Sequence, residues 1–595
     1  MNTFKQIDTL LTQGTKEAFE KLYQYTLEDQ QIIIQETNAN FTADITIAVF
    51  PLIKFSKKNP EETANEIGQY LKDNIAEIED FNVVKGFLNI IFSNTYWLSF
   101  FSYLQENTCY EFLKPTHKKV LLEYTGPNSN KALHLGHIRN MMLGYSLANI
   151  LKAAGDEVVK VNIYNDRGIA ICKSMLAWKK LGNNETPDTA GIKGDHFVGK
   201  YYQLFDKVYK SEIETLVANG SSKEEAEKNA PIMIEAQDML LKWEAGDESI
   251  INLWKMMNDW VFKGHDETFN NLGIDFEKVY FESENYMFGK DIVLEGLKNG
   301  VYKKRADGAV VVDLTEDGLD EKVLLRADGT SIYLTQDLGV AQQRYNDYHM
   351  DDSLYVVGSE QDYHFKVLKL ALQKAGKPYA DGIKHISYGM VDLPSGKMKS
   401  REGTVVEADD LITGMVEIAK QQTIELGKVS SMNETELENL YRVLGLGALK
   451  FYILKVNAKK RIMFNPEESI DFHGFTGPFI QYTYTRIRSI LRKAGEVKTL
   501  NNIHYTLQPI ERELLSVLYK APEVLAESAK QYDPSVMANY VYSIAKTYNK
   551  FYGECPVLAA ATEEEKECRI ALSALTGRMI KHGLGLLGIE VPERM

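Results

Sequence analysis

The 595-residue sequence has few cysteines and no long apolar run, and both absences limit what the protein can be. Its four cysteines, Cys109, Cys172, Cys555 and Cys568, are far apart and form no CxxC pair. We therefore expect free thiols in a reducing compartment, and neither disulfides nor a structural zinc site. No apolar segment approaches the ~20 residues that cross a bilayer, and the first residues have no secretory signal pattern. The sequence predicts a soluble, cytoplasmic protein without membrane contacts.

Positive charge is in the minority. The sequence has 68 Lys and Arg residues against 83 Asp and Glu residues, which gives a formal net charge of −15. That average argues against a nucleic-acid partner, although binding depends on a local basic face rather than on the total. Two basic groups occur late in the chain: Lys450, Lys455, Lys459, Lys460 and Arg461, then Arg486, Arg488, Arg492 and Lys493. On charge alone, solvated helix faces explain both groups.

The common nucleotide-binding loops are also missing after the first strand of the α/β part, where neither GxGxxG nor GxxxxGK[ST] occurs. This strand is predicted at Val120–Leu122, and Gly126, Pro127 and Asn128 end it. Apolar residues with helical spacing follow from Gly136 to Ala154. Two histidines, His134 and His137, therefore lie at a helix N-terminus, where free N–H groups favour an anion.

The pattern of elements predicts three regions in a chain too long for one core. Residues 119–164 read as strand, helix, strand, a unit whose ligand is expected at the carboxyl ends of its strands. The expected regions are an α+β module (1–115), a parallel-sheet α/β domain (116–410) with a helical insertion (about 181–270), and a helical bundle (411–595). Within them we expect strands at 31–53, 86–92, 309–314, 354–357 and 385–390, and helices at 61–75, 223–242, 361–375, 437–459, 478–494, 510–532, 534–551 and 563–587.

Two short motifs carry the chemical signal. The pair His134 and His137 could bind a metal or cap a helix, but no nearby Cys/His/Glu cluster completes a zinc site. A phosphate site is the more specific hypothesis, because Gly136 lets a nucleotide approach the backbone. The second motif, Gly396–Gly403, holds Lys397 and Lys399 and could be a solvated turn or a loop that reaches a polyphosphate. Each motif alone is weak evidence for a nucleotide-binding site.

In this order and separation, the two motifs resemble the HIGH and KMSKS signatures of class I aminoacyl-tRNA synthetases. Other segments resemble arginyl-tRNA synthetases in particular: EYTGPN, VNIYNDRG, GDHFVGKYYQLF, YLTQDLG, VVGSEQDYHF, KSREGTVV, GPFIQYTYTRIRSILRKA and GIEVPERM. The resemblance covers essentially the whole chain. It implies a Rossmann-like catalytic domain of the class I synthetase type, an N-terminal α+β module that meets the tRNA near its D-loop, and a C-terminal helical bundle that binds the anticodon.

The resemblance also implies a reaction. L-arginine and ATP, with Mg²⁺, would form arginyl-adenylate and pyrophosphate, and the arginine would then pass to the terminal adenosine of tRNA(Arg), which must be present before activation. The attacking carboxylate is already ionised, so positioning and charge stabilisation suffice. We expect a monomer without an editing domain. Two alternatives are a nucleotidyltransferase that shares only the HxGH site and a catalytically idle, tRNA-binding paralogue.

ATP contacts are implied for residues of both motifs and for one further histidine near the ribose or adenine: His134, Gly136, His137, Lys397, Met398, Ser400 and His364. One position departs from the family signature, because Ser400 stands where its second lysine would be and Lys399 comes one place earlier. Arginyl enzymes that lack this lysine tend to carry one just before the first motif, where this chain has Lys131. We therefore predict a catalytic set of His134, His137, Lys131, Lys397 and Lys399.

Selection of arginine requires acceptors for a guanidinium group, which pairs strongly with carboxylates. The resemblance places five residues around the amino acid: Glu123, Asn128, Tyr333, Asp337 and Gln361. We predict that Asp337 pairs with the guanidinium and that Glu123 and Gln361 lie nearer the α-amino group. A carboxylate at the end of a buried strand costs free energy unless it is paired, and a cationic ligand would explain Glu123.

Aromatic and basic side chains alternate in the segment QYTYTRIR of the C-terminal region. Its residues Tyr482, Tyr484, Arg486 and Arg488 combine stacking surfaces with positive charge, which suits unpaired bases and phosphates. Core tyrosines with solvated arginines are an equally good explanation for any one of them. We predict that the four residues contact tRNA.

Overall fold

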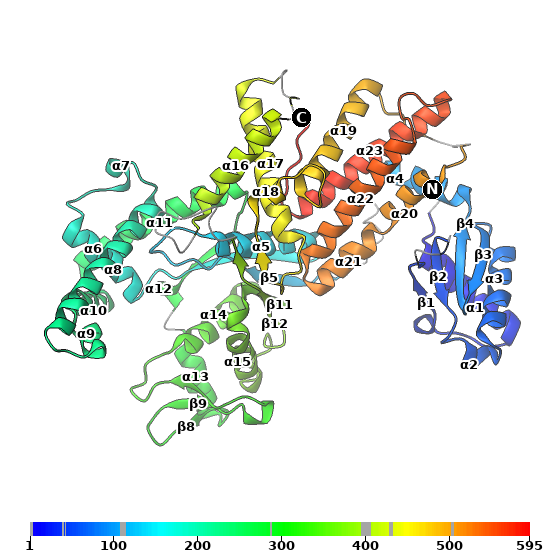
Figure 1. The fold of residues 1–595 in the computed structure, drawn as a ribbon. Coiled ribbons are helices and arrows are strands. Elements are labelled where there is room, and N and C mark those ends of the chain that lie inside the picture. The colour runs from blue at the N-terminus through cyan, green and yellow to red at the C-terminus, as the bar shows by residue number, and fades with distance from the viewer. Residues whose placement is uncertain are drawn as a thin grey trace.

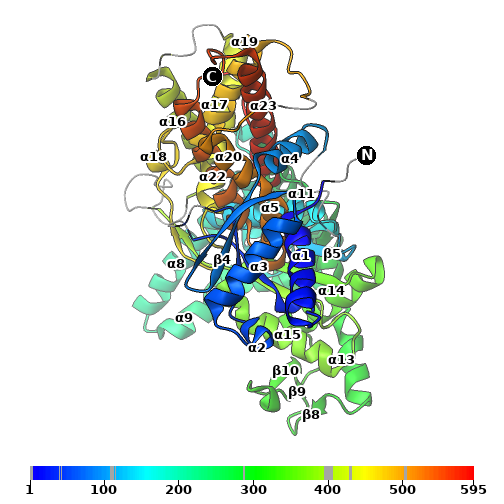
Figure 2. The same ribbon diagram turned by 90° about the vertical axis from the view of Figure 1, so that its right-hand side faces the viewer.

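The computed structural model describes residues 4–38, 41, 43–107, 113, 115–285, 288–393, 406–425, 427, 432–500 and 505–595. A central parallel sheet lies between a helical insertion on one side and a long helical bundle on the other (Figure 1). The N-terminal module lies at the end of the bundle, to which ion pairs such as Arg512–Asp44 join it, and a small antiparallel sheet projects below the parallel one (Figures 1 and 2). No helix in the described part of the chain is long and apolar enough to cross a membrane.

The N-terminal module is an antiparallel sheet of order β1-β2-β4-β3 covered by two longer helices. Its elements are α1 (Ile7–Tyr23), β1 (Ile33–Gln35), β2 (Ile45–Ala48), α2 (Ile53–Ser56), α3 (Pro60–Asn74), β3 (Ile78–Val84) and β4 (Phe87–Phe92). Gly68 lets α3 approach the sheet, because a Cβ there would lie 2.4 Å from the Phe81 ring. The predicted helix at 61–75 and strand at 86–92 are confirmed, as is the strand material in 31–53. Helix α1 was not predicted.

Helix α4 (Asn94–Glu106) belongs with the bundle rather than with this module. The Asn94 side chain donates to the carbonyl of Tyr505 at 2.8 Å and accepts from the Leu507 amide at 2.9 Å. The region predicted as one unit, residues 1–115, therefore ends in a helix that packs with the third region.

The central sheet has five parallel strands in the order β12-β11-β5-β6-β7. They are β5 (Lys119–Glu123), β6 (Glu157–Tyr164), β7 (Lys278–Phe281), β11 (Asp352–Gly358) and β12 (Ile383–Tyr388). Helix α5 (Leu135–Ala153) connects β5 to β6 and is buried between the sheet and the bundle helices. The order of connection reverses between β5 and β11, and ligands of doubly wound folds bind at this switch point. The predicted strands at 354–357 and 385–390 are confirmed.

The helical insertion follows β6 and has an apolar core of its own. It comprises α6 (Ile169–Leu181), α7 (Pro187–Ala190), α8 (Gly194–Ala218), α9 (Lys223–Asn229), α10 (Pro231–Glu244) and α11 (Glu248–Leu272). The predicted helical character is confirmed, although the helices begin before residue 181. The single helix expected over 223–242 is two helices, because Pro231 starts a new one.

A second excursion lies between β7 and β11. It contains α12 (Glu282–Asn285), α13 (Gly289–Lys298), β8 (Lys303–Lys304), β9 (Val310–Val312), β10 (Lys322–Leu325) and α14 (Tyr333–Tyr348). The strand predicted at 309–314 is β9, but it belongs to a separate antiparallel sheet of order β10-β9-β8. Helix α15 (Asp362–Lys374) follows β11 and confirms the helix predicted at 361–375.

The rest of the described chain is almost entirely helical, as predicted. Short strands β13 (Val391–Asp392) and β14 (Ile462–Met463) pair with each other, and the helices are α16 (Ala408–Glu425), α17 (Glu434–Leu454), α18 (Pro466–Ser469), α19 (Gly477–Ala494), α20 (Pro509–Tyr519), α21 (Ala521–Gln531), α22 (Pro534–Glu554) and α23 (Glu563–Leu586). The helix predicted at 510–532 is divided at Lys520, ahead of Pro522. Inside the bundle, Arg569 donates from Nε to buried Glu511 at 2.7 Å.

Candidate active site

The two histidines of the first motif cap the N-terminus of α5. His134 is the N-cap residue, and its Nδ1 accepts from the Gly136 amide at 3.1 Å. The Nδ1 of His137 accepts from the His134 amide, also at 3.1 Å. A ring nitrogen that accepts carries no proton, so both neutral rings carry their proton on Nε2. The capping bonds therefore leave each ring with an Nε2–H donor for a ligand.

Both rings stay neutral at physiological pH. Burial, together with the charge of Lys131, lowers the pKa of His134 to about 4. Burial also lowers the pKa of His137 well below its usual value, and His134, His265 and Lys131 add to that effect. The histidines therefore offer hydrogen bonds rather than charge, and positive charge at a phosphate site must come from lysines or a cation.

Gly136 is required by the histidine beside it. A Cβ at this position would lie 2.9 Å from Cε1 and 3.1 Å from Nδ1 of His134. Any larger residue would push the ring out of its capping position. This requirement is additional to the predicted one, that Gly136 leaves room for a nucleotide.

Both flanks of the segment that carries the second motif are tied to α5 or to the residues just before it. On the N-terminal side, buried Arg139 donates to the carbonyl of Met390 at 2.9 Å and to those of Ala458 and Lys460 at 2.8 and 2.7 Å. On the C-terminal side, the Leu135 amide donates to Val406 at 3.1 Å. The predicted residues Lys397, Met398, Lys399 and Ser400 themselves lie outside the described residues.

Lys131 lies where its charge acts on both motif histidines, since it lowers the pKa of each. Its backbone carbonyl contacts Nε2 of the fully buried His265 at 3.0 Å. Burial lowers the pKa of His265 to about 4, so the neutral ring donates to that carbonyl. The role of Lys131 at the phosphates stays a prediction.

The predicted arginine-binding residues come from four segments around the switch point between β5 and β11. Glu123 ends β5, Gln361 follows β11, and Tyr333 and Asp337 lie in the first turns of α14. Asn128 lies in the loop after β5, where it bridges to Asn165 after β6. Tyr333 is 78% exposed, and Asn128 and Gln361 are also exposed.

The carboxylate of Glu123 already has a partner within the protein. Arg344, which is fully buried on α14, donates from Nη2 to Glu123 and lies between the rings of Tyr280 and Tyr355. The expectation that a cationic ligand explains this carboxylate is therefore incomplete. Nε and Nη1 of Arg344 have no hydrogen-bond partner among the described residues.

Asp337 pairs with His364, two turns ahead of Arg344 along α14. Its Oδ2 lies 2.5 Å from Nε2 of His364 on α15, and this hydrogen bond raises the pKa of the histidine. His364 was predicted near the ribose or adenine of ATP, but its ring contacts the residue predicted to bind the guanidinium. Among the described residues the other oxygen of Asp337 has no hydrogen-bond partner, and the side chain is 44% exposed, so a ligand can reach it.

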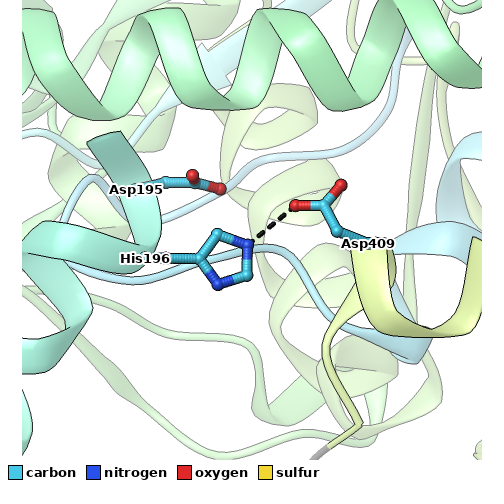
Figure 3. Close-up of side chains that lie close together, drawn as sticks. All are labelled: Asp195, His196 and Asp409. Atoms are coloured by element: carbon cyan, nitrogen blue, oxygen red, sulfur yellow. Dashed lines mark hydrogen bonds and ion pairs between the residues drawn. The ribbon is translucent and has the colours of Figure 1, made fainter. Parts of the chain in front are cut away.

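One cluster of the described residues has a spacing that a metal ion could use: Asp195 and His196 at the start of α8 with Asp409 at the start of α16 (Figure 3). Lys193 already lies there, with Nζ 2.6 Å from Asp409 and 3.3 Å from Asp195. A cation would have to displace this ammonium group. The arrangement therefore favours an ion-pair cluster over a metal site.

Three family models match the chain. The family model described as tRNA synthetases class I (R), catalytic domain, matches residues 101–465. The DALR anticodon binding domain matches 480–595, and the arginyl tRNA synthetase N terminal domain matches 7–92. The chain belongs to the arginyl-tRNA synthetase family.

Individual relatives of this family agree over the full length. The arginine–tRNA ligase of Bacteroides thetaiotaomicron is 50% identical over 596 residues, which cover 99% of this chain and all of that protein. The ligase of Flavobacterium psychrophilum is also 50% identical, over 602 residues. Among solved structures, Thermus thermophilus arginyl-tRNA synthetase has the same fold, with a TM-score of 0.81 and 24% identity over 99% of this chain and 100% of that one.

The residues predicted to contact tRNA in this synthetase differ in their accessibility. Tyr484 is only 3% exposed and donates to Glu593 at 3.0 Å, so its ring packs inside the bundle and is not available for stacking on a base. Arg488 is partly exposed but pairs with the same carboxylate at 2.6 Å. Arg486 lies between the rings of Tyr482 and Tyr552. The prediction for Tyr484 is wrong in this conformation.

Two residues of the synthetase site were missed by sequence reasoning. Arg344 continues the apolar stripe of Leu334, Leu338 and Ala341 on α14, and an arginine in such a stripe is a detectable sign of a buried ion pair. Arg139 likewise lies among the buried residues of α5. Each holds a loop or a carboxylate of the site in place.

Proposed function

We propose that the protein ligates L-arginine to tRNA(Arg) in two steps, arginyl-adenylate formation from arginine and ATP followed by transfer to the terminal adenosine. The observation that carries the proposal is the pair of Nε2–H donors on His134 and His137, at a helix N-terminus joined to both flanks of the lysine motif. Family membership over the whole length supports the choice of arginine and tRNA(Arg).

In the first step, the ATP phosphates lie against the N-terminus of α5. The two imidazole donors and the helix dipole hold phosphate oxygens, and Lys131 with Lys397 offsets the charge that develops as pyrophosphate leaves. The arginine carboxylate attacks the α-phosphate without a general base, because it is already ionised. Catalysis therefore consists of alignment and charge stabilisation.

Mg²⁺ accompanies ATP in this proposal, but the described phosphate site has few of the ligands it prefers. The side chains at the N-terminus of α5 are histidines and a lysine, whereas Mg²⁺ binds carboxylates, phosphates and water. We therefore assign the ion to the phosphate oxygens and solvent rather than to a protein cage.

Arginine is selected at the switch point of the sheet. Asp337 pairs with the guanidinium, for which it has a free oxygen and a partly exposed side chain. Glu123 remains bound to Arg344 and offers its remaining lone pairs to the α-amino group together with Gln361. Tyr333 and Asn128, both exposed, line the entrance.

The outer regions bind the tRNA. The bundle that contains the DALR domain takes the anticodon, and the N-terminal module meets the elbow near the D-loop. We further propose that the protein acts as a cytoplasmic monomer and that tRNA must bind before arginine is activated. The two alternative functions have less support, because the three family models together match most of the chain and both motif histidines are present.

Charging with each amino acid in turn tests this function. Purified protein with ATP, Mg²⁺ and total tRNA should incorporate arginine alone, and a tRNA(Arg) transcript should replace the total tRNA. A His134→Ala variant serves as the inactive control. Charging with another amino acid, or adenylylation of tRNA without any amino acid, would refute the assignment.

A further inference from the structure

The ion-pair cluster at the start of α8 joins the helical insertion to the segment that follows the lysine motif. Residues 406–408 of that segment lie along residues 133–135, at the N-terminus of α5. The Leu135 amide donates to Val406 at 3.1 Å, and the Ala408 amide donates to Leu133 at 2.8 Å. His134 and Glu407 form the bridge between them. The segment is therefore held directly beside the first motif histidine.

His196 binds both carboxylates that this segment carries. Its Nδ1 lies 2.8 Å from Oε2 of Glu407, and its Nε2 lies 2.7 Å from Oδ2 of Asp409. Two carboxylates facing both ring nitrogens require a donor on each, which is an imidazolium. Burial lowers the pKa of His196, but the bonds to Asp409 and Glu407 outweigh it and raise the pKa to about 10.

Lys193 completes the cluster and binds the same oxygen of Asp409, Oδ2, as His196, whose hydrogen bond to Asp409 is drawn in Figure 3. Its Nζ donates to Asp409 at 2.6 Å and to Thr268 on α11 at 2.6 Å. Thr268 in turn donates to the second oxygen of Asp409 at 2.9 Å. Both oxygens of Asp409 are thus fixed by groups of the insertion.

The same part of the insertion holds Lys131. His265, one turn before Thr268 on α11, donates to the Lys131 carbonyl at 3.0 Å and lies 3.9 Å from Asp195 in the cluster. The insertion therefore contacts both sides of the phosphate site. One contact fixes the backbone of Lys131, and the other fixes the segment that leads out of the lysine motif.

We propose that Lys193 and His196 are positioning residues for the adenylation step: they hold Glu407 and Asp409, and with them residues 406–408, against the histidine motif. This proposal rests on the proposed function. Neither residue touches a reacting atom. Their contacts lie on the phosphate side, away from the segments that carry Asp337 and Gln361. Loss of the cluster should therefore affect ATP far more than arginine.

The test measures tRNA-dependent, arginine-dependent ATP–pyrophosphate exchange for His196→Gln and Lys193→Met. We expect kcat/KM for ATP to fall at least tenfold per active site, with the KM for arginine within twofold of the wild type. Lys193→Arg should recover activity to within about threefold, because it restores the charge. Lys200, on α8 like His196, forms an ion pair of 2.8 Å with Glu185, and Lys200→Met is the matched control with expected wild-type kinetics.

A purely structural role would give a different pattern. It would lower the melting temperature and the number of active sites while leaving kcat/KM for ATP per active site within twofold, and that result overturns the proposal. An equal rise of both KM values overturns it as well. Should His196→Gln fail to fold, Asp409→Asn tests the same contacts at nearly unchanged volume, with the same expected split. Absence of exchange in the wild type would overturn the proposed function and this inference together, whereas unchanged variants beside an active wild type overturn the inference alone.

Discussion

Replacement of Asp337 by asparagine should weaken arginine binding selectively. The variant keeps the size of the side chain and one oxygen but removes the charge that pairs with a guanidinium. A hydrogen bond to a charged group contributes about 1.5–3 kcal/mol, which corresponds to a change of roughly 10- to 150-fold. Because the Asp337 side chain is 44% exposed, solvent screens part of this energy, and we expect the KM for arginine to rise about 10- to 30-fold.

The assay is tRNA(Arg) charging at varied arginine and at varied ATP. The KM for ATP should stay within twofold, since the phosphate site is built on α5 and not on α14. Asp362→Asn, on the neighbouring helix α15, is the control. It also removes a carboxylate that is paired with a histidine, because Asp362 lies 3.0 Å from His385. It should leave both constants unchanged. Equal increases in the two KM values of Asp337→Asn would refute the assignment of Asp337 to the guanidinium.

Three further predictions concern acid stability, the buried ion pair and tRNA binding. The free energy of unfolding should fall as the pH drops from about 6.5 to about 4, because the unfolded chain binds protons at imidazoles that the folded chain keeps neutral. Denaturant titrations at several pH values should show a smaller change of this free energy with pH for His134→Gln. An identical pH dependence in the variant would contradict the explanation. Arg344→Met should destabilise the protein by about 3 kcal/mol, because it leaves Glu123, only 12% exposed, without its partner. Denaturant unfolding measures this, and a loss below about 1 kcal/mol would exclude a structural role for the pair. Arg488→Ala should raise the KM for tRNA a few-fold while Tyr484→Phe leaves it unchanged, because only the arginine is partly exposed; charging at varied tRNA would show the reverse if the tyrosine read a base.

Much of the fold follows from local patterns in the sequence. The apolar runs of β5 and β11 and the helical spacing of α5 predicted a parallel sheet with a ligand site at its carboxyl edge, and the structure confirms the sheet. The predictions failed where one residue breaks a helical pattern or where strand pairing depends on distant residues. Pro231 divides one predicted helix, and the apolar run that forms β9 gave no sign that it pairs in a separate sheet.

The site was less accessible to sequence reasoning, because its pairings join distant segments. Both motifs could be located from their residues, but the partner of Glu123 lies 221 positions away, at Arg344. The contact between Asp337 and His364 likewise depends on how α14 and α15 pack, which no spacing encodes. The role of His196 could not be predicted for the same reason, although its motif was noticed.

We propose that the two separated motifs form one phosphate site, in which Lys131 replaces the lysine that is missing at position 400. The most direct measurement is ATP–pyrophosphate exchange, with arginine and tRNA present, for Lys131→Ala and for the double variant Lys131→Ala/Ser400→Lys. We expect a loss of at least tenfold in the single variant and recovery of most of that activity in the double variant. Nearly unchanged exchange in Lys131→Ala, or no recovery when Ser400 becomes lysine, would contradict it.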